Sequence, residues 1–352
     1  MGGRAAWLDT LRAEVAFHAE APARERTGDG FDWHWFASRS RRASAPPQAG
    51  EPFSVDWLAA HAEPLWEARD HLADDASRLL FDAHLVLRGA GPARFWFPRL
   101  DFADWLTVQG SSPFVAEGLP ADYLGQPLEV FDITIAADGT RLKLVATAMQ
   151  VGLCNTFRQY VPIRGGVRLG PRPGDVVLDC GACIGDFATL FAALVGGTGA
   201  VHLFDPVPLH VRYCRHQMRL NPHLASILHP VQAAVGATAA SMAGGIVDVA
   251  RVSPGGLAVD CCGQVSLDGY AEVAGLPRVD FVKMDIEGAE PEALAGAVDC
   301  LARHRPRLAI STYHRPEHLW EIPRVILAAN PRYRLHFAHH MPVKWESVYY
   351  AV

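Results

Sequence analysis

The sequence predicts an α/β fold built on a doubly wound, mostly parallel sheet of seven strands. From Gly174 onward, short apolar segments alternate with amphipathic helical segments, the pattern of a parallel sheet covered on both faces. The last two strand-like segments have no helix between them, which indicates an antiparallel edge strand. Half of the 352 residues are hydrophobic, enough to bury a sizeable core.

The first 52 residues are expected to form a helix and a mobile linker. Residues 4–20 have a helical composition, whereas residues 21–52 mix Pro, Ser and Arg. The short basic patch in this linker (RSRR) is most simply a solvated loop.

Residues 53–127 are expected to form a helical cap. Ser54 can cap a first helix, which Pro64 should kink or split. A second helix is expected over 74–88, where apolar residues recur at helical spacing, with its end at Gly89.

Residues 128–164 are expected to form a β-hairpin and a helix that leads into the core. The segments 128–135 and 140–147 flank Asp138 and Gly139, and an Asp-Gly pair between strand-like segments is a strong hairpin signal.

The remaining residues, 165–352, form the main predicted domain. Residues 236–265 are small and polar and show no helical pattern. The predicted strands are 175–179, 200–204, 228–235, 279–284, 307–312, 333–339 and 346–351. The predicted helices are 186–195, 208–220, 290–304 and 317–329.

Charge and composition argue against several classes of protein. The net charge is −6 without a long basic run, so a nucleic-acid partner is not favoured. No apolar run approaches the roughly 20 residues that span a bilayer, so no membrane partner is expected. The N-terminus lacks a secretory apolar region, and seven scattered cysteines suggest reduced thiols, so a cytoplasmic location is expected.

The segment LDCGACIGD, where the first strand of the main domain meets its helix, has two interpretations. Cys180 and Cys183 form a C-x-x-C pair, as in redox proteins. Alternatively, Gly181 and Gly185 let the backbone approach a nucleotide-like cofactor closely, and Asp179 can accept hydrogen bonds from it.

The next strand favours the cofactor interpretation. It ends in Asp205, followed by Pro206, and an acidic residue in this position can accept hydrogen bonds from both ribose hydroxyls. The glycine spacing is not G-x-G-x-x-G, and an acid directly before the first glycine repels phosphate. S-adenosylmethionine fits better, because it carries a ribose, an ammonium and a sulfonium but no phosphate.

Several longer segments resemble one family. GDVVLDCGACIGDF (174–187), VHLFDPVP (201–208), VDFVKMDIEGAEPEALAGA (279–297) and RLAISTYHRPEHLWEIPRVI (307–326) are similar to FkbM-family methyltransferases, a branch of the class I S-adenosylmethionine-dependent enzymes. The resemblance covers roughly 165–352. It implies the class I methyltransferase fold, S-adenosyl-L-methionine as methyl donor, and a hydroxyl on a sugar or secondary metabolite as acceptor.

The resemblance also implies a set of cofactor-binding residues. Two of them depart from the family pattern, which commonly has Asn in place of Cys183 and Glu in place of Asp205. The expected set is Asp179, Gly181, Ala182, Cys183, Gly185, Asp186, Phe187, Asp205, Pro206 and Asp285.

With this resemblance, Cys180 and Cys183 are best explained as small residues of a cofactor loop. A thioredoxin-like domain does not account for Asp205 or the DIEGAE segment. A zinc site needs further ligands, and Cys261 and Cys262 are adjacent and poorly placed to supply them.

Three residues are candidates for catalysis. A hydroxyl nucleophile needs a positioned base during transfer, and Asp285, Glu287 and His314 all follow central strands. Each has an alternative role: Asp285 can anchor the methionine end of the cofactor, Glu287 can cap a helix, and so can His314. Glu290, in the first turn of that helix, suits the helix dipole.

No residues show a spacing typical of metal ligands, so no metal site is assigned, and a divalent ion in the carboxylate-rich site with His314 stays open. His339 and His340 are neighbours on a strand and face opposite sides. The expected partner is a small-molecule or glycan acceptor, and no feature indicates the oligomeric state. Two other functions stay open: a cofactor-binding scaffold without turnover, and a nicotinamide oxidoreductase, which the missing G-x-G-x-x-G disfavours.

Overall fold

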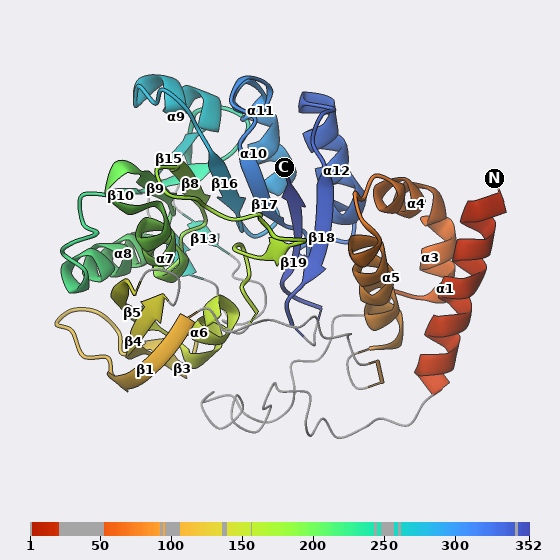
Figure 1. Ribbon diagram of the computed structural model, residues 1–352, viewed down its shortest axis with the longest axis horizontal. Helices are drawn as coiled ribbons and strands as arrows, with labels where there is room; N and C mark the ends of the chain where they lie inside the picture. Colours follow the sequence, from red (N-terminus) through yellow and green to blue (C-terminus); the bar gives the residue numbers. More distant parts are fainter. Residues whose placement is uncertain are drawn as a thin grey trace.

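The computed structural model has a central seven-stranded sheet with helices on both sides, a smaller sheet, and a group of N-terminal helices (Figure 1). The expected linker, 21–52, and the expected turn residue Asp138 lie outside the part of the chain that it describes. The described ranges are 2–20, 53–91, 94–95, 106–135, 139–155, 157–242, 245–247, 257–259, 262–341 and 344–352.

The central sheet confirms the predicted fold class. Neighbouring strands are parallel except for the two pairs that involve β19, which lies one position in from the edge because β18 pairs outside it. The order is β10 (Leu228–Val231), β9 (Ala200–Phe204), β8 (Val176–Cys180), β16 (Phe281–Met284), β17 (Arg307–Ser311), β19 (Ser347–Ala351) and β18 (Leu335–His339).

The order of the strands reverses beside β8. The chain builds outward from β8 to β10 and then returns to the other side of β8 with β16. In open α/β sheets, ligands bind at such a switch point, at the carboxyl ends of the strands. The glycine-rich segment after β8 and the DIEGAE segment after β16 therefore flank this point.

Helices cover both faces of the sheet (Figure 1). The predicted helix 290–304 is two helices, because the chain turns at Gly296, where a Cβ would lie 2.3 Å from the carbonyl oxygen of Gly236. One face carries α7 (Asp186–Val195) and α8 (Pro208–Leu220). The other carries α9 (Leu267–Val273), α10 (Glu290–Ala295), α11 (Val298–Arg303) and α12 (His318–Ala329).

Four helices precede these: α1 (Gly2–Glu20), α3 (Val55–Ala60), α4 (Ala62–Asp70) and α5 (Asp75–Ala90). Ser54 caps α3 by accepting a hydrogen bond from the Trp57 N–H, and the predicted split falls at His61. The expected end at Gly89 is wrong: α5 runs on to Ala90. Gly89 instead faces α1, where a Cβ would lie 2.8 Å from Val15.

This helical region covers the outer strand of the sheet. Ala73 donates a backbone hydrogen bond to Leu335 of β18, and the Ser77 hydroxyl accepts one from the Phe337 N–H. The side chain of Asp74, which also caps α5, lies 2.6 Å from His336 Nδ1. The cap thus satisfies backbone groups of an edge strand that would otherwise be open to pairing with another chain.

The predicted hairpin is confirmed as β4 (Glu129–Ile135) and β5 (Arg141–Ala146), followed by α6 (Ala148–Asn155). The expected helical cap over 53–127 does not extend to its end, because β1 (Leu106–Pro113) pairs antiparallel with β4. Seven of the eight residues of β1 are exposed, so the strand has no apolar alternation that sequence analysis can detect.

Two amides of α8 join the small sheet to the main domain. Gln217 accepts from the Val145 N–H and donates to the Val145 carbonyl, and Asn221 does the same with Lys143. The two side chains pair with the backbone of β5 as the peptide groups of a neighbouring strand would. These hydrogen bonds fix the small sheet against α8.

The short remaining elements are β2 (Asp122–Tyr123), β3 (Gln126–Pro127), β6 (Ile163–Arg164), β7 (Val167–Arg168), η1 (Gly196–Thr198), β11 (Ala233–Val235), β12 (Ala240–Met242), β13 (Gly245–Val247), β14 (Leu257–Val259) and β15 (Cys262–Val265). None of the helices in the described ranges is both long and apolar enough to cross a membrane.

Candidate cofactor and catalytic site

The loops after β8, β9, β16 and β17 meet at the carboxyl edge of the sheet. The loops after β8 and β16 touch through their backbones. A Cβ on Gly181, whose φ is +79°, would lie 1.8 Å from the carbonyl oxygen of Asp285. Only a residue without a side chain allows this contact, so Gly181 brings the glycine-rich loop and the acidic loop together.

The glycine-rich loop is tied to the neighbouring strand. The N–H groups of Gly181 and Ala182 both donate to the carbonyl of Phe204, the last residue of β9. Gly185, with φ of +81°, then begins the turn into α7. Backbone hydrogen bonds to β9 therefore hold the loop in place.

Several residues at this edge of the sheet have strained backbone conformations. Seven non-glycine residues in the described ranges have positive φ, and four of them lie in or beside the site. Such conformations cost about 1–3 kcal/mol each and cluster at functional sites. The four residues are Tyr160 (φ +66°), Cys183 (+51°), Glu287 (+57°) and Glu346 (+68°).

The two cysteines of the C-x-x-C pair are free thiols in this structure. Cys180 is fully buried, and the Cys183 thiol donates to the Tyr123 hydroxyl at 3.1 Å. Burial raises the pKa of both thiols well above the ordinary value. Reactive thiols have lowered pKa values, so this environment disfavours the redox interpretation.

Asp205 is buried and bonded to the protein. Its Oδ2 accepts a hydrogen bond from the Cys183 N–H, and its Oδ1 accepts from the Val207 N–H and from His210 Nδ1, each at 2.9 Å. Because a carboxylate only accepts, Nδ1 of His210 carries the proton. Nε2 of His210 is then free to accept from the Tyr123 hydroxyl, 3.2 Å away.

These contacts bear on the expected ribose site. A carboxylate offers about four acceptor positions, and Asp205 already uses three. One position is left for a ribose hydroxyl, so accepting from both hydroxyls requires Asp205 to release a protein donor.

Asp179 is turned into the protein interior. Its side chain has no exposed surface and lies 3.1 Å from Lys283 Nζ. Lys283 also donates to the carbonyl of Gly181 at 2.6 Å. Burial alone would lower the pKa of Lys283, but Asp179 and Asp285 outweigh it and raise the pKa above its ordinary value. Asp179 thus holds the lysine that supports the glycine-rich loop.

Asp285 lies at the centre of a hydrogen-bond network. Its two oxygens accept from the hydroxyls of Tyr160 and Tyr313, at 2.8 and 2.9 Å. The Tyr160 hydroxyl is also 3.0 Å from Ser311 Oγ. His314 Nε2 lies 3.3 Å away. The carboxylate is therefore fixed in orientation while 22% of its side-chain surface stays exposed.

His314 and Glu287 lie together beside Asp285. His314 Nε2 is 3.5 Å from Glu287, and Nδ1 is 2.9 Å from Glu290. Burial would lower the pKa of His314, but Glu290, Asp285 and Glu287 outweigh it and raise the pKa to about 9. Only 4% of the His314 side chain is exposed, against 29% for Glu287. All three predicted catalytic residues are thus adjacent, and Glu287 is the most accessible.

The other expected cofactor residues line the start of α7 and the loop after β9. Asp186 is buried, and the burial raises its pKa to about 6. Phe187 is also buried and packs edge-on against Tyr160, with ring centroids 4.9 Å apart. Pro206 is half-buried next to Asp205.

Sequence analysis missed several residues of this site. Lys283 was detectable, since a lysine inside an apolar strand needs a buried partner. Tyr313 directly precedes a candidate residue. Tyr123 and Tyr160 come from the N-terminal half of the chain, and no local pattern connects them with the loops they contact.

Residues 179–340 match the family model of the methyltransferase FkbM domain. A crystal structure of methyltransferase FkbM from Methylobacillus flagellatus KT aligns with a TM-score of 0.54 at 20% identity, over 85% of this chain and 62% of that one. This chain thus spans less than two thirds of that relative's length.

A structure of an S-adenosylmethionine-dependent methyltransferase from Aquifex aeolicus aligns with a TM-score of 0.32 at 17% identity, over 52% of this chain and 84% of that chain. Among curated proteins, no sequence matches. The FkbM structure agrees with the fold predicted here, and the matched family agrees with the expected cofactor. Over residues 179–340, this chain is therefore similar to the methyltransferase FkbM domain.

Proposed function

We propose that this protein transfers a methyl group from S-adenosylmethionine to a hydroxyl group of a small-molecule or glycan acceptor. The observation that carries the proposal is the contact between the donor loop and the acidic loop, where Gly181 meets the backbone of Asp285. Because Glu287 follows Asp285 by two residues, we expect its carboxylate to lie near the loop proposed to hold the methyl donor.

The residues present fit this cofactor in part. Asp205 retains one acceptor position for a ribose hydroxyl. Gly181 and Gly185 are packed against Asp285 and Cys214, so these glycines shape the donor loop itself. The acidic groups around Asp285 favour a ligand that carries an ammonium and a sulfonium. When bound, the cofactor supplies an already activated methyl group, so the protein has to align the acceptor and exclude water.

Among the three candidate bases, we propose that Glu287 accepts the proton of the acceptor hydroxyl. Its carboxylate is the most exposed of the three, and its strained backbone is held by the surrounding loops. Both ring nitrogens of His314 face carboxylates, so neither points to an acceptor. Asp285, held by two tyrosines, would orient His314 and the cofactor.

Calorimetric titration with S-adenosylmethionine and S-adenosylhomocysteine tests the donor. We expect binding that is indifferent to reducing agent. Asp205→Ala should weaken it about ten- to a hundredfold, through the loss of charge-assisted hydrogen bonds worth roughly 1.5–3 kcal/mol. Asp9→Ala, an exposed aspartate on α1, is the matched control and should bind as the wild type does.

Methyl transfer to a panel of sugars and hydroxylated metabolites, followed by mass spectrometry, tests the reaction. A methylated oxygen in any product supports the proposal. Cofactor binding with no transfer would favour the alternative, a binding module without turnover. Binding that needs oxidised cysteines would instead overturn the cofactor site itself.

A further inference from the structure

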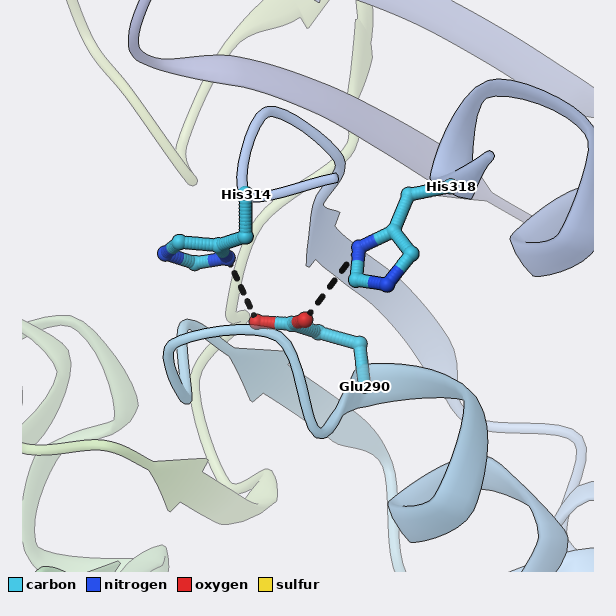
Figure 2. Close-up of side chains that lie close together, drawn as sticks. All are labelled: Glu290, His314 and His318. Carbon is cyan, nitrogen blue, oxygen red and sulfur yellow. Dashed lines mark ion pairs between the residues drawn. The ribbon is translucent and has the colours of Figure 1, made fainter. Parts of the chain in front are cut away.

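A second group of polar side chains lies behind the acidic loop and shares His314 with the candidate site, whereas the proposed methyl transfer uses neither Glu290 nor His318. Glu290 begins α10, His318 begins α12, and His314 lies in the loop between β17 and α12. Figure 2 shows both imidazole rings turned toward the same carboxylate. His314 Nδ1 is 2.9 Å from Glu290 Oε1, and His318 Nδ1 is 3.4 Å from Glu290 Oε2.

The atoms that face each other here lack hydrogen bonds. Nδ1 of His314, Nδ1 of His318 and Oε2 of Glu290 are buried and make none, although they lie within ion-pair distance. Glu290 Oε1 accepts from the Ile286 N–H. The side chains are at most 4% exposed. Burying unpaired polar atoms is costly, so a group that satisfies all three at once would stabilise this arrangement.

The distances suit a metal ion. Two ligand atoms bound about 2.0–2.2 Å from one zinc ion lie roughly 3–3.5 Å apart. The two separations observed, 2.9 and 3.4 Å, are close to this range, and the three ligand atoms all lie within 4.8 Å of one another. An ion needs only small side-chain movements to enter.

The second ring nitrogen of His314 adds an independent argument. A histidine that binds a metal through one nitrogen usually donates its other N–H to a carboxylate, which fixes the ring. His314 Nε2 lies 3.3 Å from Asp285 and 3.5 Å from Glu287. Two carboxylates are therefore close enough to accept the Nε2–H on the side of the ring away from Glu290.

We propose that Glu290, His314 and His318 bind a divalent transition-metal ion, best Zn²⁺, through one carboxylate and the Nδ1 atoms of both imidazoles. Imidazole with carboxylate suits zinc and its neighbours, whereas Mg²⁺ prefers oxygen ligands in an octahedron. The ion ties the loop after β16 to the start of α12. It also holds His314 with its Nε2–H toward Asp285 and Glu287, as a positioning residue.

The test uses the full chain, free of affinity tag and dialysed against a chelator. Zn²⁺ is titrated by calorimetry, and Co²⁺ is added separately to record its visible spectrum. We expect one equivalent to bind, a Co²⁺ spectrum without the thiolate charge-transfer band that cysteine ligands would produce, and a higher melting temperature with Zn²⁺. Excess Mg²⁺ should not compete.

Two variants and a control locate the site. His318→Asn and Glu290→Gln should each weaken Zn²⁺ binding by more than about tenfold. His223→Asn, an exposed histidine, should leave it unchanged. Binding that survives in both site variants, or a thiolate band with Co²⁺, would overturn the proposal.

The wild-type protein alone also decides the question. If it binds no Zn²⁺ and its melting temperature does not respond to chelator or metal, the three residues form a buried ion pair and not a metal site. Calorimetry with S-adenosylhomocysteine on the same metal-free sample separates this outcome from a failure of the methyltransferase proposal, because the donor loop contains none of the three ligands.

Discussion

Two groups of buried charges lie on either side of the β16 strand end, and their charges are balanced differently. Lys283 faces Asp179 at 3.1 Å, with side chains 5% and 0% exposed, so one positive charge meets one negative charge. On the other side, His314 lies within 3.5 Å of Asp285, Glu287 and Glu290. His314 there faces three carboxylates, and Glu290 among them also has a second imidazole nearby, that of His318.

This difference in charge balance indicates a structural role for the first group and a binding role for the second. The Lys283–Asp179 pair is closed: it supports the carbonyl of Gly181 and has no surface left for a ligand. The group around His314 has an excess of negative charge and a partly exposed carboxylate in Glu287. Protons, a metal cation or the positive charges of S-adenosylmethionine can neutralise this negative charge. The group around His314 can therefore bind a positively charged ligand, which the Lys283–Asp179 pair cannot.

The largest expected effect tests whether the closed pair is structural. Lys283→Met leaves Asp179 buried without its partner, and breaking a buried pair in this way costs about 3–5 kcal/mol. Urea unfolding at neutral pH should show a loss of this size in the free energy of unfolding.

The double variant Lys283→Met/Asp179→Leu is the control. Replacing both charges with apolar groups of similar size is often neutral, so most of the stability should return. If the single variant is as stable as the wild type, or the double variant is no better than the single one, the pair does not have the closed structural role described here.

Much of the fold was predictable, because its information is local. Most strands of the central sheet are short, mainly apolar runs, as in VVLDC of β8. The features that were missed depend on distant contacts. The polar strand β1 exists through its pairing with β4, and the break at Gly296 exists because Gly236 packs against it.

The sequence predicted which strand ends form the site. It did not predict which side chains contact one another there. Motif position located Asp285, Glu287 and His314, which the structure brings together. One of the two tyrosines that donate to Asp285, Tyr160, comes from 125 residues earlier in the chain. The sequence also did not predict which way a side chain points. Asp179 and Lys283 both lie in apolar strand segments, and the structure turns the Asp179 carboxylate toward Lys283.

The second prediction concerns the open side of the comparison. Glu287→Gln keeps the size of the side chain and removes the proposed base, so turnover should fall about a hundredfold or more, since a positioned base contributes at least this factor. Affinity for S-adenosylhomocysteine, measured by calorimetry, should change little. Glu292→Gln, an exposed neighbour on α10, should keep full turnover.

Full turnover in Glu287→Gln would show that the carboxylate is not the proton acceptor. A large loss in His314→Gln, with cofactor affinity intact, would then return His314 to that role. A loss of cofactor affinity in Glu287→Gln would instead assign Glu287 to binding, and the excess of negative charge would serve the sulfonium alone.

The smallest expected effect concerns the pKa of Glu346, which reports how unfavourable a further negative charge is beside Asp285. Burial and the nearby Asp285 raise the pKa of Glu346 to about 8. In the unfolded chain this carboxyl has its ordinary pKa of 4.5. Between these two values the unfolded chain loses the proton while the folded chain keeps it. The contribution of Glu346 to stability is therefore full below pH 4.5 and is lost as the pH rises toward 8.

Glu346→Gln removes this dependence. Relative to the wild type, the variant should gain about 1–2 kcal/mol in the free energy of unfolding between pH 5 and pH 8.5, less than the full shift implies because Glu346 is partly exposed. Glu272→Gln, on the exposed face of α9, should show no such gain. A gain equal in both variants would mean that Glu346 titrates as a surface group, and that the negative charge around Asp285 is already neutralised within the group.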